Sequence, residues 1–231
     1  MRRTIASLLA SLMLAAPVAA QDQPVVVELF TSQGCSSCPP ADAFLHKLAE
    51  REDVIALALH VDYWDYIGWK DVFANPDYTT RQRSYARKGG RRMIYTPQMV
   101  INGQDHVVGN RPMDVTDLIE MHQDKEPSVA LTLTRDGDQI EIAATTEASF
   151  SDPLTVQLVR YSPDNKVEIK SGENAGRTIS YANVVTDLSV INEWDTAAPL
   201  EFSQNVEGDQ PVVVLVQNQS TGVIEAAAKV N

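Results

Sequence analysis

Cysteine is scarce in this chain: Cys35 and Cys38 are the only two among 231 residues. A disulfide between them would close a loop of four residues, which removes only roughly 2 kcal/mol of chain entropy from the unfolded state. A chain of this length buries a sizeable hydrophobic core without such help. The two cysteines therefore indicate a reactive pair rather than a structural cross-link.

Other features are also missing, and each absence narrows the class of protein. Beyond the N-terminus, no apolar run is long enough to cross a bilayer. Basic residues number 19 against 31 acidic ones, so the formal net charge is −12 at pH 7. This excess of negative charge disfavours binding to nucleic acid and to anionic membranes. We therefore expect a globular protein with no nucleic-acid partner and no stable membrane insertion.

Residues 1–20 have the pattern of a secretory signal peptide. Arg2 and Arg3 form the basic start, an apolar stretch follows over residues 5–14, and residues 18–20 form a small-residue cleavage site. The apolar stretch is too short to span a bilayer. We predict export to the periplasm or to the exterior, where disulfides persist.

The cysteine pair lies where an apolar strand, predicted over residues 23–30, gives way to a helix over residues 41–51. The start of a helix lowers the pKa of a nearby thiol and so favours the thiolate at neutral pH. Asp42 in the first turn suits the helix dipole. Two prolines after the pair make the turn between the sulfurs irregular. We expect Cys35 to be the more exposed thiol and the nucleophile, and Cys38 to be the resolving thiol.

Glu28 is the one charged residue in the first predicted strand. A carboxylate in an otherwise apolar strand needs a physical reason. One interpretation is a partly buried proton acceptor for Cys38. The other is a residue that points outward at the end of the strand, and the sequence leaves both open.

Residues 62–92 form an inserted segment that is first aromatic and then basic. It contains a predicted helix over residues 76–88, between an Asn-Pro start and a Gly-Gly stop. The segment is typical of a lid or groove for a substrate, with Trp64 as a contact residue. The alternative is that the aromatic residues close a small core and the arginines only solvate a helix.

The rest of the first half predicts strands and helices in alternation. The helix between two buried strands predicts a parallel βαβ unit, and an Asn-Gly pair predicts a hairpin ahead of a further helix. The elements expected after the first helix are a strand over 53–61, strands over 98–101 and 106–108, and a helix over 112–122.

From about Glu126 the pattern changes to regularly spaced short strands without helices. Such spacing favours an antiparallel β-sandwich, so we predict one domain over residues 21–126 and a second over residues 127–231. The expected strands span 129–134, 139–144, 154–161, 166–169, 177–185, 200–203, 212–217 and 223–228.

With Cys35-Ser36-Ser37-Cys38 after one strand and Thr96-Pro97 before another, residues 23–125 resemble the thioredoxin superfamily. The resemblance implies a cis Thr96–Pro97 peptide bond that faces the dithiol, and backbone groups of Thr96 that hold a bound peptide. The sequence therefore predicts an α/β thioredoxin-like domain followed by an antiparallel β-sandwich domain. More narrowly, residues 28–42, 60–65 and 172–177 resemble a bacterial family of secreted thioredoxin-like proteins without an assigned function.

The leading functional hypothesis is a periplasmic or secreted thiol–disulfide oxidoreductase without a cofactor. Its partners would be protein thiols or disulfides, or a periplasmic redox partner. Cys35 would attack a substrate sulfur and Cys38 would resolve the mixed disulfide. The Ser36 and Ser37 amides would stabilise the thiolate, and Thr96 and Pro97 would hold the peptide.

Two other hypotheses remain open. The cysteines could bind or deliver Cu(I), since thiolates bind this ion well, although the chain fixes no metal ligand beyond the pair. Candidates for a third ligand are His60, Met99 and His106. Alternatively, the chain is a binding module in which Glu173, Asn174 and Arg177 grip a partner; the simpler interpretation of that segment is a polar turn.

Overall fold

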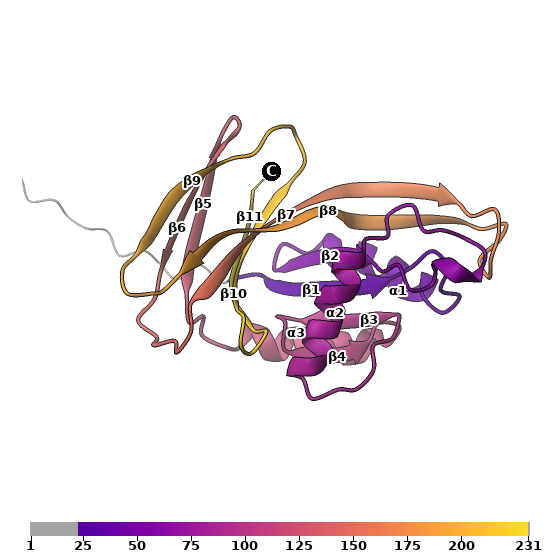
Figure 1. Cartoon of the computed structure of the whole chain (residues 1–231), viewed down its shortest axis with the longest axis horizontal. Coiled ribbons are helices and arrows are strands. Elements are labelled where there is room, and N and C mark those ends of the chain that lie inside the picture. Colours follow the sequence, from indigo (N-terminus) through magenta and orange to yellow (C-terminus); the bar gives the residue numbers. More distant parts are fainter. Residues whose placement is uncertain (1–22, 231) are drawn as a thin grey trace, which may run out of the picture.

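The computed structural model describes residues 23–230. In that range the chain forms three α-helices and eleven strands, arranged as an eight-stranded mixed sheet and a three-stranded sheet (Figure 1). The predicted signal peptide lies outside the described residues. In the same range, no helix combines the length and the apolar character needed to cross a membrane.

The first half of the chain follows the predicted alternation closely. The strands β1 and β2 pair in parallel around the helix α1, as expected for a βαβ unit. The bounds of each predicted helix and strand differ from the observed ones by no more than about two residues. The elements are β1 (Val25–Thr31), α1 (Pro39–Ala49), β2 (Val54–His60), the 3-10 helix η1 (Asp65–Ile67), α2 (Pro76–Lys88), β3 (Gln98–Ile101), β4 (Asp105–Val108) and α3 (Pro112–Gln123).

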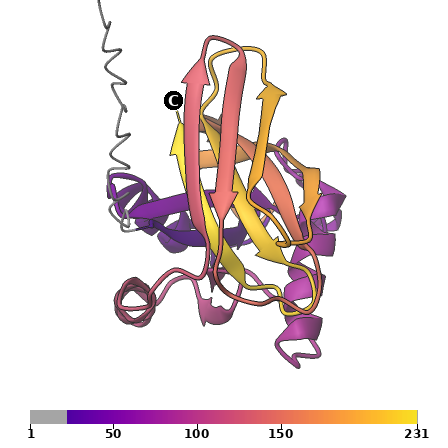
Figure 2. The same ribbon diagram turned by 90° about the vertical axis from the view of Figure 1, so that its left-hand side faces the viewer.

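The prediction of an α/β thioredoxin-like domain followed by an antiparallel β-sandwich domain is wrong. Four strands of the second half join the four strands of the first half in one sheet, with the order β11-β10-β7-β8-β2-β1-β3-β4. Among the strands of residues 23–230, β5, β6 and β9 form a separate sheet (Figure 2). The elements are β5 (Ala130–Asp136), β6 (Gln139–Thr145), β7 (Leu154–Glu168), β8 (Thr178–Trp194), β9 (Leu200–Asn205), β10 (Val212–Asn218) and β11 (Ile224–Val230).

The error arises at residues 162–165, where Ser-Pro-Asp-Asn resembles a turn. The strand β7 instead continues through this segment, and its ladder with β10 ends at Arg160. Beyond that point β7 pairs with β8 alone, so Pro163, which has no N–H, lies on an unpaired edge where a strand tolerates proline. The resulting long hairpin runs alongside the first-half strands, and Val184 of β8 pairs in parallel with Ala58 of β2.

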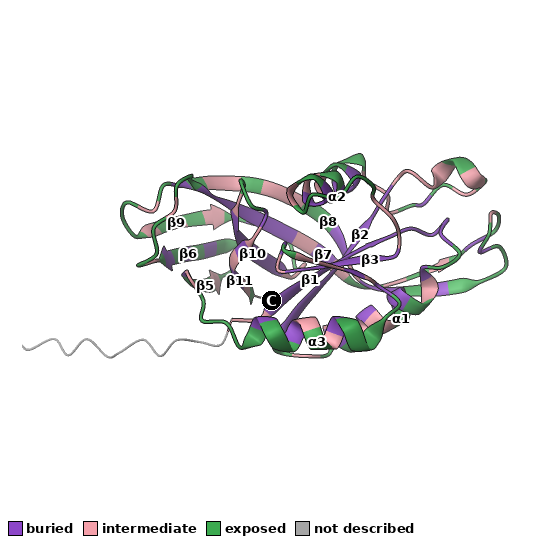
Figure 3. Ribbon diagram, turned by 90° about the horizontal axis from the view of Figure 1, so that it is seen from below, coloured by how far each residue is buried: buried purple, intermediate pink, exposed green. Residues whose placement is uncertain are grey.

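The faces of the large sheet are covered by different helices. Alternate residues of β1 point to opposite faces. Val27 and Leu29 pack with α1 and α3, whereas Val26 and Phe30 pack with α2, as the two layers of helix in Figure 3 show. A third apolar cluster lies between the two sheets. The disulfide at the start of α1 therefore belongs to the face that carries the odd-numbered residues of β1.

Candidate functional site

The two cysteines form a disulfide at the start of α1, with a sulfur–sulfur distance of 2.08 Å. Cys38 is the N-cap residue of the helix. Cys35 is 2% exposed and Cys38 is fully buried, whereas Ser36 and Ser37 between them are exposed. Cys35 is thus the more exposed of the pair by only a small margin. In the oxidised loop the serine side chains contact solvent, whereas the sulfurs are buried.

The tip of the β7–β8 hairpin holds the disulfide loop in place. Asn174 is almost completely buried, and its Nδ2 donates hydrogen bonds to the carbonyls of Gln33 and Cys35, each at 2.9 Å. Arg177 Nη1 in turn donates to Asn174 Oδ1 at 3.0 Å. The sequence favoured a plain polar turn here, but the structure makes Asn174 a clamp on the loop.

Trp64 connects the disulfide loop to the loop that precedes β3. Its Nε1 donates a hydrogen bond to Thr96 Oγ1 at 2.7 Å. On its other side it lies against Gly34, where an added Cβ would be 3.2 Å from Trp64 Cβ. The Thr96–Pro97 bond is cis, which confirms that prediction. The structure therefore brings Trp64 and Thr96 to the same region as the disulfide.

Pro97 also approaches the first turn of α1. A Cβ added at Gly109 would lie 3.3 Å from Pro97 Cβ and 3.2 Å from Ala41 Cβ. Pro97 is buried, and its carbonyl accepts a hydrogen bond from the Gly109 amide at 3.0 Å. The predicted substrate-binding residues thus lie around one end of α1.

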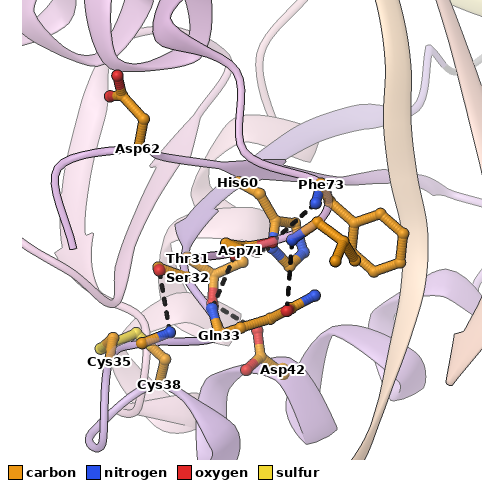
Figure 4. Close-up of polar contacts among 12 residues, drawn as sticks. Thr31, Ser32, Gln33, Cys35, Cys38, Asp42, His60, Asp62, Asp71 and Phe73 are labelled. Carbon is orange, nitrogen blue, oxygen red and sulfur yellow. Dashed lines mark hydrogen bonds and ion pairs between the residues drawn. A yellow bond between two sulfur atoms is a disulfide. The ribbon is translucent and has the colours of Figure 1, made fainter. Parts of the chain in front are cut away.

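A buried polar cluster lies beside the disulfide loop, as Figure 4 shows. Thr31 Oγ1 donates to Asp42 Oδ1 at 2.7 Å. His60 Nδ1 and Asp71 Oδ2 are 2.7 Å apart, and neither side chain is exposed. Asp71 Oδ2 also accepts a hydrogen bond from the Gln33 amide at 2.8 Å, which ties the cluster to the loop.

Asp42 is the unusual member of this buried cluster. Burial raises the pKa of its carboxyl to about 7, although the hydrogen bond from Thr31 and the charge of His60 act in the opposite direction. Asp42 lies one helical turn after Cys38, and its amide donates to the Cys38 carbonyl at 3.1 Å. A carboxyl that exchanges its proton near neutral pH therefore lies one turn from the disulfide.

Several polar atoms in the cluster lack a hydrogen-bond partner within residues 23–230. They are Gln33 Nε2, Asp42 Oδ2, His60 Nε2 and the Tyr181 hydroxyl. The rings of Phe73 and Tyr181 pack edge-on against His60, with centroids 5.2 and 4.9 Å away. Burying a polar group without a hydrogen-bond partner is unfavourable in free energy. A catalytic role is one reason why a protein retains such a group.

The structure does not bring Glu28 to the disulfide. Its side chain points to the α2 face, where Oε1 accepts a hydrogen bond from Arg81 Nε at 2.6 Å and Oε2 accepts one from the Tyr85 hydroxyl. Gln157 and Gln217 complete the shell around Arg81 at 3.0 and 3.2 Å. Glu28 thus joins β1 to α2 and to the second-half strands β7 and β10.

Sequence reasoning missed Asp71, named His60 only as a candidate copper ligand, and named Asn174 only as part of a possible partner-binding segment. Strand parity offered a partial signal, because Thr31 and His60 end parallel neighbours and so point to the same face. For Asp42 the sequence indicates only a favourable position at the start of the helix dipole. Asp71 and Asn174 reach the loop from distant segments, and no local pattern indicates their contacts with it.

The candidate ligands for copper are not gathered. His60 Nδ1 contacts Asp71, Met99 is buried in the apolar core, and His106 lies beside Tyr85 on the α2 face. Across the part of the chain that the structure describes, no group of three or more His, Cys, Asp or Glu side chains could hold a metal ion. No observation therefore favours the Cu(I) hypothesis.

These features define a mixed-sheet protein whose only cysteines form a short-loop disulfide beside a buried acid–histidine cluster. The chain belongs to the family described as protein of unknown function (DUF1223), whose family model matches residues 26–217. The matched stretch contains every residue of the site described above. The predicted membership of a family without an assigned function is thereby confirmed.

Two solved structures are similar to the chain. A crystal structure of a protein from Agrobacterium tumefaciens is 32% identical, covering 91% of this chain and 96% of that one, with a TM-score of 0.77. HBP35 of Porphyromonas gingivalis is 15% identical and shares the fold with a TM-score of 0.63, covering 90% of this chain and 75% of that one. A comparison with curated proteins finds no match.

Proposed function

We propose that the protein is a thiol–disulfide oxidoreductase of the periplasm or the exterior, with Cys35 and Cys38 as its redox pair. The observation that carries the proposal is the placement of this disulfide at the start of α1, one turn from the buried carboxyl of Asp42. The predicted signal peptide supports the compartment, since disulfide exchange is useful where disulfides persist.

The reaction is a reversible exchange between this disulfide and a protein dithiol. A substrate thiolate attacks Cys35 Sγ, the sulfur–sulfur bond breaks, and its electron pair goes to Cys38 Sγ. The second substrate thiolate then attacks the substrate sulfur of the mixed disulfide and releases Cys35 as a thiolate. The substrate dithiol is oxidised to a disulfide, and the Cys35–Cys38 disulfide is reduced to a dithiol.

In this proposal Asp42, and not Glu28, exchanges a proton with Cys38. Cys38 becomes a thiolate in a buried place, where an uncompensated charge is unfavourable. A carboxyl with a pKa of about 7 is protonated often enough to donate to Cys38 and ionised often enough to accept the proton back. Cys38 and Asp42 are four residues apart and so lie on one side of the helix.

The remaining predicted site residues supply the substrate surface. Ser36 and Ser37 are exposed at the mouth of the loop, and Ser37 Oγ is 3.4 Å from Cys35 Sγ. Trp64 and Thr96 flank the loop as a hydrogen-bonded pair. Because Cys35 is only 2% exposed, a substrate must displace part of this cover before it reaches the sulfur.

The test is to trap the mixed disulfide. In the Cys38→Ala variant, Cys35 forms an adduct with a protein substrate that no second thiol resolves, and non-reducing gels followed by mass spectrometry identify it. Cys35→Ala is the matched control, since the buried Cys38 should form no such adduct. Equal labelling of the two variants, or the absence of any adduct on Cys35, would refute the proposal.

A second measurement addresses the chemistry without a known partner. The reduced protein should reduce insulin disulfides, and the Cys35→Ser/Cys38→Ser variant should be inactive. Equilibration with glutathione buffers then gives the potential of the pair, which decides whether it acts as a reductant or as an oxidant. A pair that glutathione and dithiothreitol fail to reduce in the folded protein would contradict a redox role.

A further inference from the structure

A group of arginines lies on α2 and on the loop that follows it. Residues 81–92 contain six basic residues and no acidic one, in a chain whose net charge is −12. Arg81 forms an ion pair with Glu28. The other four arginines line a shallow groove of about 470 Å³, which we call the arginine groove; its residues are Arg83, Ala86, Arg87, Arg91, Arg92, Met93 and Ile94.

The arginines of this groove form no ion pair within the described residues. The ion pairs found there include none of Arg83, Arg87, Arg91 and Arg92, and all four are exposed. Nearby titrating groups respond to the excess charge. Burial lowers the pKa of Lys88, and the charges of Arg81 and Arg87 lower it further. The groove is thus a local positive field on an acidic protein.

The arginine groove is joined to the loop in front of the disulfide. Gln82 Nε2 donates to the Tyr95 carbonyl at 2.8 Å, and the Tyr63 hydroxyl donates to Gln82 Oε1 at 3.2 Å. The loop that carries Arg91 and Arg92 runs directly into Thr96. Met93, which is 78% exposed, adds an apolar surface between the charges and Thr96.

We propose that the arginine groove binds an acidic segment of the substrate protein, the protein whose thiols or disulfide react at Cys35. A short acidic segment meets the arginines without approaching the rest of the protein's surface. A bilayer or a nucleic-acid duplex is larger than the groove and would bring its charges within about 10 Å, one Debye length, of the acidic remainder. The use of the groove in catalysis rests on the proposed function, but binding of the segment does not.

The binding test removes the redox chemistry. A fluorescein-labelled peptide of ~10 residues, rich in glutamate and free of cysteine, is titrated with the Cys35→Ser/Cys38→Ser protein, and anisotropy is recorded at low and high salt. We expect binding that weakens with salt and that falls roughly tenfold when Arg83, Arg87, Arg91 and Arg92 are all changed to Gln.

The matched control removes the same number of charges elsewhere, by changing the exposed Lys47, Lys166, Lys170 and Lys229 to Gln. This control should bind within about twofold of the parent. Equal losses in both variants would show that only net charge matters and would overturn the proposal. Tighter binding to vesicles of anionic phospholipid than to the peptide would overturn it as well.

A kinetic arm separates this proposal from the proposed function. Disulfide exchange is followed with an acidic and a neutral peptide that carry the same disulfide, using the protein with both cysteines. Peptide binding at the groove without any exchange would end the oxidoreductase proposal and leave the groove intact. Equal exchange rates on both peptides, unchanged in the four-arginine variant, would end the groove proposal and leave the oxidoreductase.

Discussion

Replacing Asp42 with Asn tests whether the buried cluster holds a carboxyl that titrates near neutral pH. The pKa of Asp42 is about 7 in the folded protein, against 3.8 without the fold, and burial is the main cause. Between these two pH values the native carboxyl keeps its proton while the unfolded one has lost it. The contribution of Asp42 to stability is therefore fully present below about pH 4 and is lost as the pH rises through 7.

The size of this loss follows from the two pKa values. Their difference corresponds to roughly 4 kcal/mol, at 1.36 kcal/mol for each pH unit. Asn at position 42 keeps the carbonyl that accepts the Thr31 hydroxyl and does not ionise. We therefore expect Asp42→Asn to match the parent near pH 4 and to be more stable by up to roughly 4 kcal/mol at pH 8.

Urea unfolding at several pH values between 4 and 8 measures this difference, with the disulfide kept oxidised so that no thiol titrates. Asp53→Asn is the control. Hydrogen bonding from Arg51 lowers the pKa of Asp53 to about 2, so that residue stays ionised in the native protein over the whole range. The effect of its replacement should therefore change only slightly between pH 4 and pH 8, because the unfolded carboxyl begins to take up its proton only near pH 4. Stability curves of Asp42→Asn and of the parent that run parallel from pH 4 to pH 8 would refute the reasoning.

Three further substitutions and one control substitution probe other contacts of the structure. Asn174→Ala removes the two hydrogen bonds to the disulfide loop. It should lower the free energy of unfolding by about 1–3 kcal/mol and speed reduction of the disulfide by dithiothreitol. An unchanged reduction rate would show that Asn174 does not hold the loop in place. Glu28→Gln leaves the Arg81 guanidinium without its counter-charge; it should cost about 3 kcal/mol in urea unfolding but leave the reduction rate unchanged, because the pair lies on the other face of the sheet. Arg51→Gln, which breaks an exposed pair, is its control and should cost less than about 1 kcal/mol. Trp64→Phe keeps an aromatic ring and loses the hydrogen bond to Thr96, so it should cost about 1 kcal/mol in the same assay; a loss as large as that of Glu28→Gln would contradict this.

Sequence reasoning located the disulfide and most of the secondary structure, because both depend on neighbours along the chain. The strand before Cys35, the helix after Cys38 and the Asn75-capped helix α2 all have local signals. The same reasoning failed at Pro163. Whether a proline ends a strand depends on whether its missing N–H would have had a partner across the sheet, and that partner is distant in sequence.

The sequence by itself determined that the two cysteines lie at the start of a helix, with a proline-led strand elsewhere in the same half of the chain. Only the tertiary structure decided what surrounds them. Asp71 and Asn174 reach the loop from segments about 40 and 140 residues away, and Glu28 turns to the opposite face. Local preferences select helices and strands, but sheet order and strand parity decide which side chains share a buried space.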